Sequence, residues 1–415
     1  MQQLWLQILR TGGSRLYSLV IGIAVLSLTA HWLGPAGRGE MAAALIWTNL
    51  FYIAGFLSLN LVAVHELAGR SDPDRLGALF GNLLLVALSV TLLGWLIAGG
   101  ISSVRPQIFG SVSPTVLVLA FAALPFLIWE QYGNALLICV GRLDVYNRAV
   151  VVSKTVALAL VVVAAAAGLG IHAAVIATVL GQMWLATAGT PTVFRSVSRI
   201  HLDWTMLRRM IVSAAKLHPS TIGTYVAAYA GVLVVNHYLG NAATGHFQLA
   251  TQLVDVMLVL PYAANLVLYG LLSESGVASL WPVQRRVLGG VVAAMAVQAV
   301  VAAVLAPWLI TLIAGHEFLP AVGIFRWLLV GTITGTLGAL MTTQWIGRGL
   351  FLQLSAVNVA TVAITLTLNF LLVPRMGING AIIASLSGYL TAGAASLALA
   401  FRCEAQWRTR EVDGP

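Results

Sequence analysis

Long uncharged stretches dominate the chain and predict membrane-spanning helices. A helix needs about 20 apolar residues to cross the hydrocarbon core of a bilayer, and stretches of this length follow one another from Leu16 to Phe401. Residues 155–194 contain no Asp, Glu, Lys or Arg, and Gly168-Leu169-Gly170 supplies a hairpin turn between two spans there. The pattern predicts twelve spans, at 16–33, 41–64, 77–101, 114–138, 147–168, 171–193, 211–237, 247–272, 287–313, 320–344, 351–373 and 379–401.

The composition supports an all-α polytopic membrane protein. Of the 415 residues, 60% are hydrophobic and only 8% are charged, whereas a soluble domain carries about a quarter charged residues. Two cysteines, Cys139 and Cys403, are too few for a disulfide framework or a thiolate metal site. The chain has no Walker-type phosphate loop, HExxH or GxSxG motif. We therefore expect neither an enzyme nor a cofactor.

The distribution of basic residues predicts the orientation in the membrane. Basic residues collect on cytoplasmic loops. With twelve spans, one side holds both termini and 18 of the 22 Lys and Arg residues, and the other side holds only Arg38, Arg105, Arg326 and Arg375. We therefore expect a multi-pass protein of the cytoplasmic (inner) membrane with both termini in the cytoplasm. The net charge of +9 reflects this topology, and no nucleic-acid partner is expected.

An internal repeat divides the chain into two similar halves. The segment HWLGPAGRG at 31–39 recurs as HYLGNAATG at 237–245, an offset of 206 that also superimposes Gly141-Arg142 on Gly347-Arg348. An even number of spans in each half makes the repeats parallel, related by an axis along the membrane normal. The sequence thus predicts two six-helix bundles, 1–200 and 201–415, around a central cavity.

The connection between the halves, residues 195–210, is the most basic expected cytoplasmic segment. Asp203 is suited to cap a short helix there. The segment combines apolar residues with two arginines, namely Leu202, Met206, Leu207 and Met210 with Arg208 and Arg209. It therefore either lies in the membrane interface or is a plain tether.

Two carboxylates fall deep within predicted spans. Asp255 follows His246 by nine residues, about 13 Å along a helix, and Glu130 is similarly deep in the fourth span. Ionisable residues inside a membrane are costly and mark ion or substrate sites. The offset of 206 aligns Asp255 with Asn49. These three residues are candidates for proton or sodium coupling, and the alternative is an interhelical hydrogen bond that only holds the bundle together.

Each half also begins with a polar helical stripe. Spacings of four residues place Arg10, Ser14 and Ser18 on one face, and the offset of 206 maps them onto Lys216, Ser220 and Thr224. Cations at the cytoplasmic end, with Arg15 beside them, would bind an anionic headgroup. The alternative is topological, because basic residues flank any helix at this face. Arg38 and Arg326, on the other side, are left without an assigned role.

Three segments carry a resemblance to a known family. They are LGPAGRGE at 33–40, VGRLDVYNRAVVVSKTVALAL from Val140 and LNFLLVPRMGINGAIIAS at 368–385. In order and loop position they resemble the polysaccharide-export branch of the multidrug/oligosaccharidyl-lipid/polysaccharide (MOP) flippase superfamily, including Wzx-type flippases. The resemblance covers essentially the whole chain.

The resemblance implies a flippase that moves a polyprenyl-diphosphate-linked oligosaccharide across the cytoplasmic membrane for cell-surface polysaccharide or lipopolysaccharide synthesis. The implied partners are the lipid-linked oligosaccharide, membrane lipids and polysaccharide assembly enzymes. Three alternatives stay open: a multidrug or cation antiporter of the same fold, a membrane O-antigen polymerase or ligase, and a non-transporting scaffold.

Overall fold

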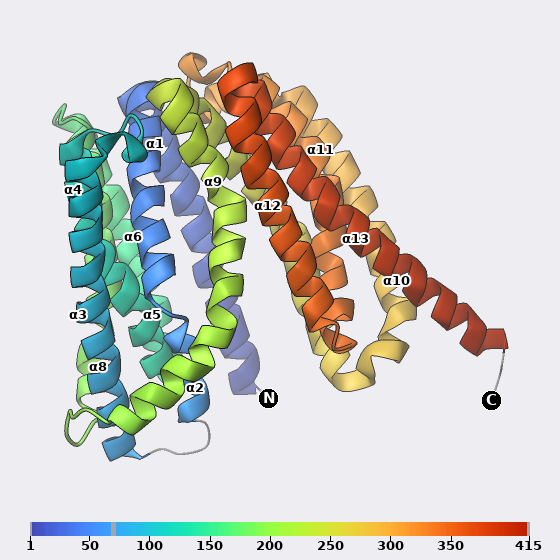
Figure 1. Ribbon diagram of the computed structural model, residues 1–415, viewed down its shortest axis with the longest axis horizontal. Helices are drawn as coiled ribbons and strands as arrows, with labels where there is room; N and C mark the ends of the chain where they lie inside the picture. The colour runs from blue at the N-terminus through green and yellow to red at the C-terminus, as the bar shows by residue number, and fades with distance from the viewer. Residues whose placement is uncertain (1, 68–71, 413–415) are drawn as a thin grey trace. The chain divides into compact units, whose positions relative to one another are not determined.

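A computed structural model describes residues 2–67 and 72–412 (Figure 1), with the side chains of residues 2–16, 217, 220, 270, 273–279, 351 and 409–412 left undescribed. The described chain is helical with no strand. Contacts divide it into two compact units, Met1–Tyr225 with Gly240–Ala242, and Val226–Leu239 with Ala243–Pro415. The boundary between the two halves of the repeat near residue 200 stays a prediction.

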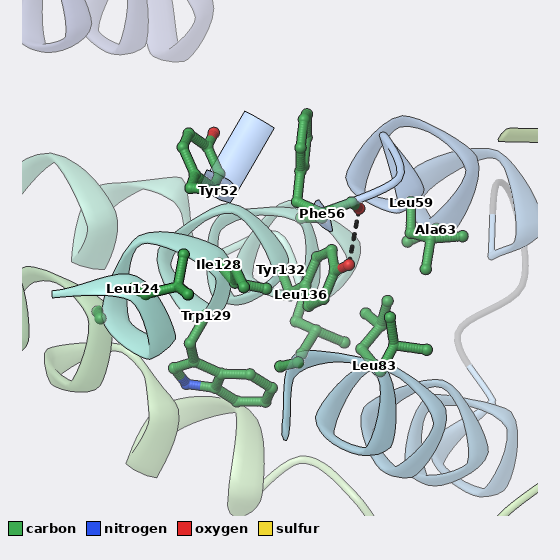
Figure 2. Close-up of a cluster of buried hydrophobic side chains, with 14 of the residues drawn as sticks. Tyr52, Phe56, Leu59, Ala63, Leu83, Leu124, Ile128, Trp129, Tyr132 and Leu136 are labelled. Atoms are coloured by element: carbon green, nitrogen blue, oxygen red, sulfur yellow. Dashed lines mark hydrogen bonds between the residues drawn. The ribbon is translucent and has the colours of Figure 1, made fainter. Parts of the chain in front are cut away.

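The first unit contains α1 to α8 and the beginning of α9. Its elements are α1 (Gln2–Gly55), α2 (Leu59–Glu66), α3 (Pro73–Val104), η1 (Pro106–Phe109), α4 (Pro114–Phe121), α5 (Leu124–Cys139), α6 (Leu143–Ala166), α7 (Ile171–Ala188), α8 (Thr190–Phe194) and α9 (Trp204–Met257). Helix α5 packs against α2, α3 and α7. Its buried side chains Leu124, Ile128, Tyr132 and Leu136 form the middle of the hydrophobic core (Figure 2).

The second unit contains the rest of α9 apart from Gly240–Ala242, together with five further helical elements. These are α10 (Val259–Ala314), η2 (His316–Phe318), α11 (Ala321–Gly347), α12 (Phe351–Met376) and α13 (Ile378–Val412). Helix α11 packs against α10 and α13, and α13 packs against α12 (Figure 1). Fully buried Phe318, Phe325 and Leu340 lie within this unit.

The expected spans are confirmed as ten membrane-length helices among the described residues. Two of the ten each consist of two helices joined at a kink. The first of these breaks at Gly34 and the second at Gly240, each with positive φ and a ψ of −177°. These two glycines are 206 residues apart, so the two halves have the same backbone conformation at this position of the repeat. Gly168 also takes a positive φ, 67°, and ends the helix before the expected hairpin turn.

The expected connection after residue 272 lies between the spans Thr221–Tyr269 and Leu280–Ala314, and its backbone is helical. Two local expectations were wrong. The expected span 41–64 is interrupted between α1 and α2, at Leu57 and Ser58. Gly347 is still helical, and Gly349 takes the positive φ that Gly141 has in the first half. Each half therefore closes this turn with a glycine, but the offset there is 208.

The connection between the halves is seated on α3 and is more than a tether. Asn82 Nδ2 donates to the Asp203 carbonyl oxygen at 2.9 Å, and the Asp203 backbone N–H donates to Asn82 Oδ1 at 3.1 Å. Asp203 also caps α9, as expected, by accepting from the Met206 N–H. Glycines 77 and 81 leave room on α3 for the backbone of residues 199 and 201. The segment is thus a fixed part of the first unit.

Candidate functional site

Four consecutive residues of α5 make polar contacts inside the first unit. Glu130 accepts hydrogen bonds from the Tyr146 hydroxyl at 2.8 Å and from Gln182 Nε2 at 2.7 Å. Gln131 accepts from Asn60 at 3.4 Å, and the Tyr132 hydroxyl donates to the Phe56 carbonyl oxygen at 2.7 Å (Figure 2). Trp129 Nε1 donates to the Thr190 hydroxyl. Helix α5 thereby ties α2, α6, α7 and α8 together.

Among the described residues, Glu130 accepts its two hydrogen bonds from neutral donors. No ion pair in the described part of the chain includes it. A carboxylate needs strong compensation in a membrane, and two hydrogen bonds to a charged acceptor each contribute about 1.5–3 kcal/mol. The donors come from α6 and α7, so the carboxylate links three helices of this unit and keeps lone pairs for a proton or a cation.

The break between α1 and α2 is a second polar centre, which the sequence did not reveal. Leu57 and Ser58 both have positive φ, 55° and 52°, a conformation that non-glycine residues seldom adopt. The buried Ser58 hydroxyl lies 3.1 Å from His218 Nδ1 and 3.2 Å from the Thr221 hydroxyl, and His218 Nε2 lies 2.9 Å from the Ala54 carbonyl oxygen. Because the carbonyl can only accept, Nε2 donates to it.

These side chains provide hydrogen bonds to backbone carbonyls that would be bonded within the helix if α1 continued. Irregular backbone at membrane depth is tolerated only where protein or a cavity provides hydrogen-bond partners. His218 and Tyr132 bind the carbonyls of Ala54 and Phe56 at the end of α1. The only hint in the sequence is the pair His218-Pro219 within the predicted span 211–237, where the proline interrupts the helical hydrogen bonds of α9.

In the second unit, the hydroxyls of Tyr229, Tyr262 and Tyr389 lie near enough to the Asp255 carboxylate to interact with it electrostatically. The ring of Tyr389 packs on Gly331 and Gly335, and a Cβ at residue 331 would collide with it at 2.4 Å. Asp255 itself is exposed at the protein surface, and no ion pair among the described residues includes it. Its carboxylate is therefore accessible to a small cation or a proton.

The polar stripes are only partly described. The side chains of Arg10, Ser14, Arg15 and Ser220 lie outside the part that the structure describes. Lys216 and Thr224 are exposed on α9, and Ser18 is half-buried on α1. The pairing of the stripes across the repeat stays a prediction.

The remaining candidates occupy distinct surroundings. Asn49 donates to the Leu45 carbonyl oxygen of its own helix at 2.8 Å. Arg38 is buried, with 7% of its surface exposed, next to the glycine break of α1. Arg326 is exposed and donates to the Ala303 carbonyl oxygen at 2.8 Å. Arg326 thus ties α11 to α10, while Asn49 serves its own helix.

The fold is that of membrane transporters of the MOP superfamily. The structure is similar to an inward-closed lipid II flippase MurJ, with a TM-score of 0.74 and 12% identity over 93% of this chain and 86% of that one. It is also similar to an inward-facing multidrug resistance MATE family transporter, with a TM-score of 0.73 and 16% identity over 95% and 96%. A MOP superfamily transporter from Pyrococcus furiosus matches with a TM-score of 0.54 and 14% identity over 96% and 93%.

The chain belongs to the polysaccharide biosynthesis protein family. The model of that family matches residues 28–323, which include most of the first half and more than half of the second. A search of curated protein sequences finds no match. The family match and the fold together confirm the resemblance drawn from the three sequence segments.

Proposed function

We propose that this protein is a flippase that moves a polyprenyl-diphosphate-linked oligosaccharide across the cytoplasmic membrane for cell-surface polysaccharide synthesis. The observation that supports this most is the polysaccharide biosynthesis family match on a chain with the fold of a lipid II flippase. Flipping breaks no covalent bond, so the protein has only to offer a polar route for sugar and phosphate while the lipid tail stays in the bilayer. Both termini would face the cytoplasm.

In this proposal the two halves alternate between openings to the two sides of the membrane. Lys216, Thr224 and Ser18, with Arg10, Ser14, Arg15 and Ser220, would receive the diphosphate headgroup. Lysine and arginine bind phosphate through charge-assisted hydrogen bonds, which are about twice as strong as neutral ones. The exposure of Lys216 on α9 supports this role, because a headgroup can reach it.

Asp255 and Glu130 would couple transport to a proton or sodium gradient. Asp255 supports this role better, because its carboxylate is exposed and its neighbours are tyrosine hydroxyls, which can both donate to a carboxylate and bind a cation through oxygen. The same cluster favours a second candidate function, a cation-coupled antiporter that exports small organic cations. Transport of such a cation, with lipid-linked oligosaccharide unaffected, would identify that function.

The flippase proposal is tested by deleting the gene and measuring on which membrane face the lipid-linked oligosaccharide accumulates. Accumulation on the cytoplasmic face, reversed by the intact gene, is expected. Normal delivery to the outer face in a strain without a redundant flippase would refute the proposal.

The headgroup site is tested by complementation with Lys216→Ala and Arg10→Ala. Each should lower transport at normal membrane abundance, because each removes a cation that would bind phosphate. Arg402→Ala is the matched control, since Arg402 is an exposed cation of α13 outside the proposed site. Normal transport by both site variants would show that the headgroup binds elsewhere.

A further inference from the structure

An apolar pocket of about 690 Å³ lies in the first unit between α3, α5, α7 and α8. Apart from Thr187, Thr190 and Arg195, every side chain that lines it is apolar. The Thr187 hydroxyl donates to the Met183 carbonyl oxygen, and the Thr190 hydroxyl accepts from Trp129. Both hydroxyls are therefore engaged within the protein, and the wall that an occupant meets is hydrocarbon.

The pocket opens beside a helix face that is suited to lipid. Leu88 of α3 lines the pocket and is 60% exposed, and the same face continues with Leu92 and Leu96, which are 58% and 63% exposed. These residues are spaced by four, so they form one stripe along the helix. In a membrane-spanning helix such a stripe faces acyl chains. An occupant of the pocket therefore enters from the bilayer.

Arginines gather at one end of this pocket. Arg195 is itself a lining residue, and Arg199 follows in the segment that is seated on Gly77 and Gly81 of α3. Both arginines are exposed, and within the residues that the structure describes neither is in an ion pair. Exposed Phe194 and Trp204, at 58% and 65%, flank them. Aromatic and basic residues together are typical of the membrane–water boundary.

We propose that this pocket and its arginines bind one anionic phospholipid of the cytoplasmic leaflet. An acyl chain would lie in the pocket, which extends along α3 from Phe80 to Leu88, about 12 Å. The phosphate would lie against Arg195 and Arg199, whose planar guanidinium groups match phosphate oxygens. A phospholipid is the ligand that joins an apolar chain to an anionic group at this boundary. Basic pockets between membrane helices bind such headgroups.

A lipid bound at this location would affect the segment that connects the two halves. Arg199 belongs to the segment that connects the halves, and that segment is hydrogen-bonded to α3 through Asn82 and Asp203. A lipid held by Arg195 and Arg199 would therefore add to the contacts that fix this connection on the first unit. Neither Glu130 nor a residue of the α9 stripe lines the pocket, although Trp129 and Thr190 of the α5 contacts do, so lipid binding there does not require the proposed cargo.

Native mass spectrometry of the delipidated protein tests the proposal. Phosphatidylglycerol should bind in preference to phosphatidylcholine, and Arg195→Gln should lower its occupancy about fivefold, the effect of one basic residue near an anionic surface. Thr187→Trp should also lower it, because the larger side chain fills the pocket at an exposed position. Arg402→Gln is the matched control and should bind normally. Equal occupancy in all variants would overturn the proposal, as would preferential binding of a polyprenyl phosphate.

Photocrosslinking to the unmodified protein provides a test that needs no variant. A phosphatidylglycerol with a diazirine in one acyl chain should label peptides that contain Leu88 or Phe126, both of which line the pocket. Excess unlabelled phosphatidylglycerol should compete, and phosphatidylcholine should not. Labelling confined to peptides outside the pocket, or equal competition by both lipids, would show that the pocket does not select an anionic lipid.

Discussion

The seating of the connecting segment on α3 predicts a specific effect of Gly77→Ala. A Cβ at residue 77 would lie 1.9 Å from the Arg199 carbonyl oxygen, whereas real Cβ atoms essentially never approach closer than 3.0 Å. The neighbour is backbone, so it cannot rotate away as a flexible side chain would. The segment must therefore move by about 1 Å, which disrupts the paired hydrogen bonds between Asn82 and Asp203.

The magnitude follows from those two hydrogen bonds. Each contributes about 1 kcal/mol net, so Gly77→Ala should make local opening of residues 198–203 about 2 kcal/mol easier. This corresponds to an opened population about thirtyfold larger. Replacing glycine by alanine inside a helix otherwise stabilises it by about 0.5–1 kcal/mol. Gly99→Ala in the same helix measures that stabilisation alone, because a Cβ at residue 99 meets nothing within 4 Å.

Limited trypsin digestion measures the opening directly. Arg199 is exposed, but cleavage requires the seated backbone to leave α3, and its rate follows the opened population when reclosing is fast. Gly77→Ala should be cut after Arg199 about thirtyfold faster than the parent protein, and Gly99→Ala should match the parent. If the two variants are cut at the same rate, the segment is not held by the contact with Gly77.

Three further predictions follow from the other polar centres and from the topology. His218→Ala should lower the free energy of unfolding by about 1–3 kcal/mol, because the Ala54 carbonyl and Ser58 hydroxyl lose their buried partner; thermal unfolding in detergent measures this, and His31→Ala, at an exposed position, should have little effect. Asp255→Asn should remove the dependence of transport on an ion gradient at normal abundance, whereas Glu317→Gln should not; unchanged coupling in vesicles would exclude Asp255. Single cysteines placed at positions 105 and 205 of a cysteine-free chain should label from opposite sides, and labelling from one side would contradict the topology.

Hydrophobic patterning was enough to predict most helices. Membrane spans need long apolar stretches, and sharp turns at positive φ need glycine, so Gly34, Gly168 and Gly240 could be recognised as breaks in the chain. The break at Leu57 and Ser58 could not, because neither residue is glycine. Their conformation depends on Tyr132 and His218, which are distant in sequence and supply the missing hydrogen bonds.

The deep carboxylates show the same division between sequence and structure. The sequence places Glu130 in the middle of a predicted span, where a charged residue is unusual and therefore noticeable. It could not identify Tyr146 and Gln182 as the hydrogen-bond donors of Glu130. Those partners come from two other helices, and only packing brings them together. The pairing of cations between the halves rests on the spacing along single helices and on the repeat offset of 206, and it stays a prediction.

The comparison of Asn49 with Asp255 indicates why the two halves of one repeat are not equivalent. Asn49 has an amide N–H to donate, and it donates to the Leu45 carbonyl of its own helix. An ionised aspartate has no donor, so Asp255 cannot make this bond with its own helix. A carboxylate at this position needs a hydrogen-bond donor or a cation from another part of the protein or from solution. The tyrosines of the second unit lie close enough to interact with it electrostatically. The change from amide to carboxylate thus turns a self-contained helix position into one that requires a partner, and for that reason we place the proposed coupling ion in the second half.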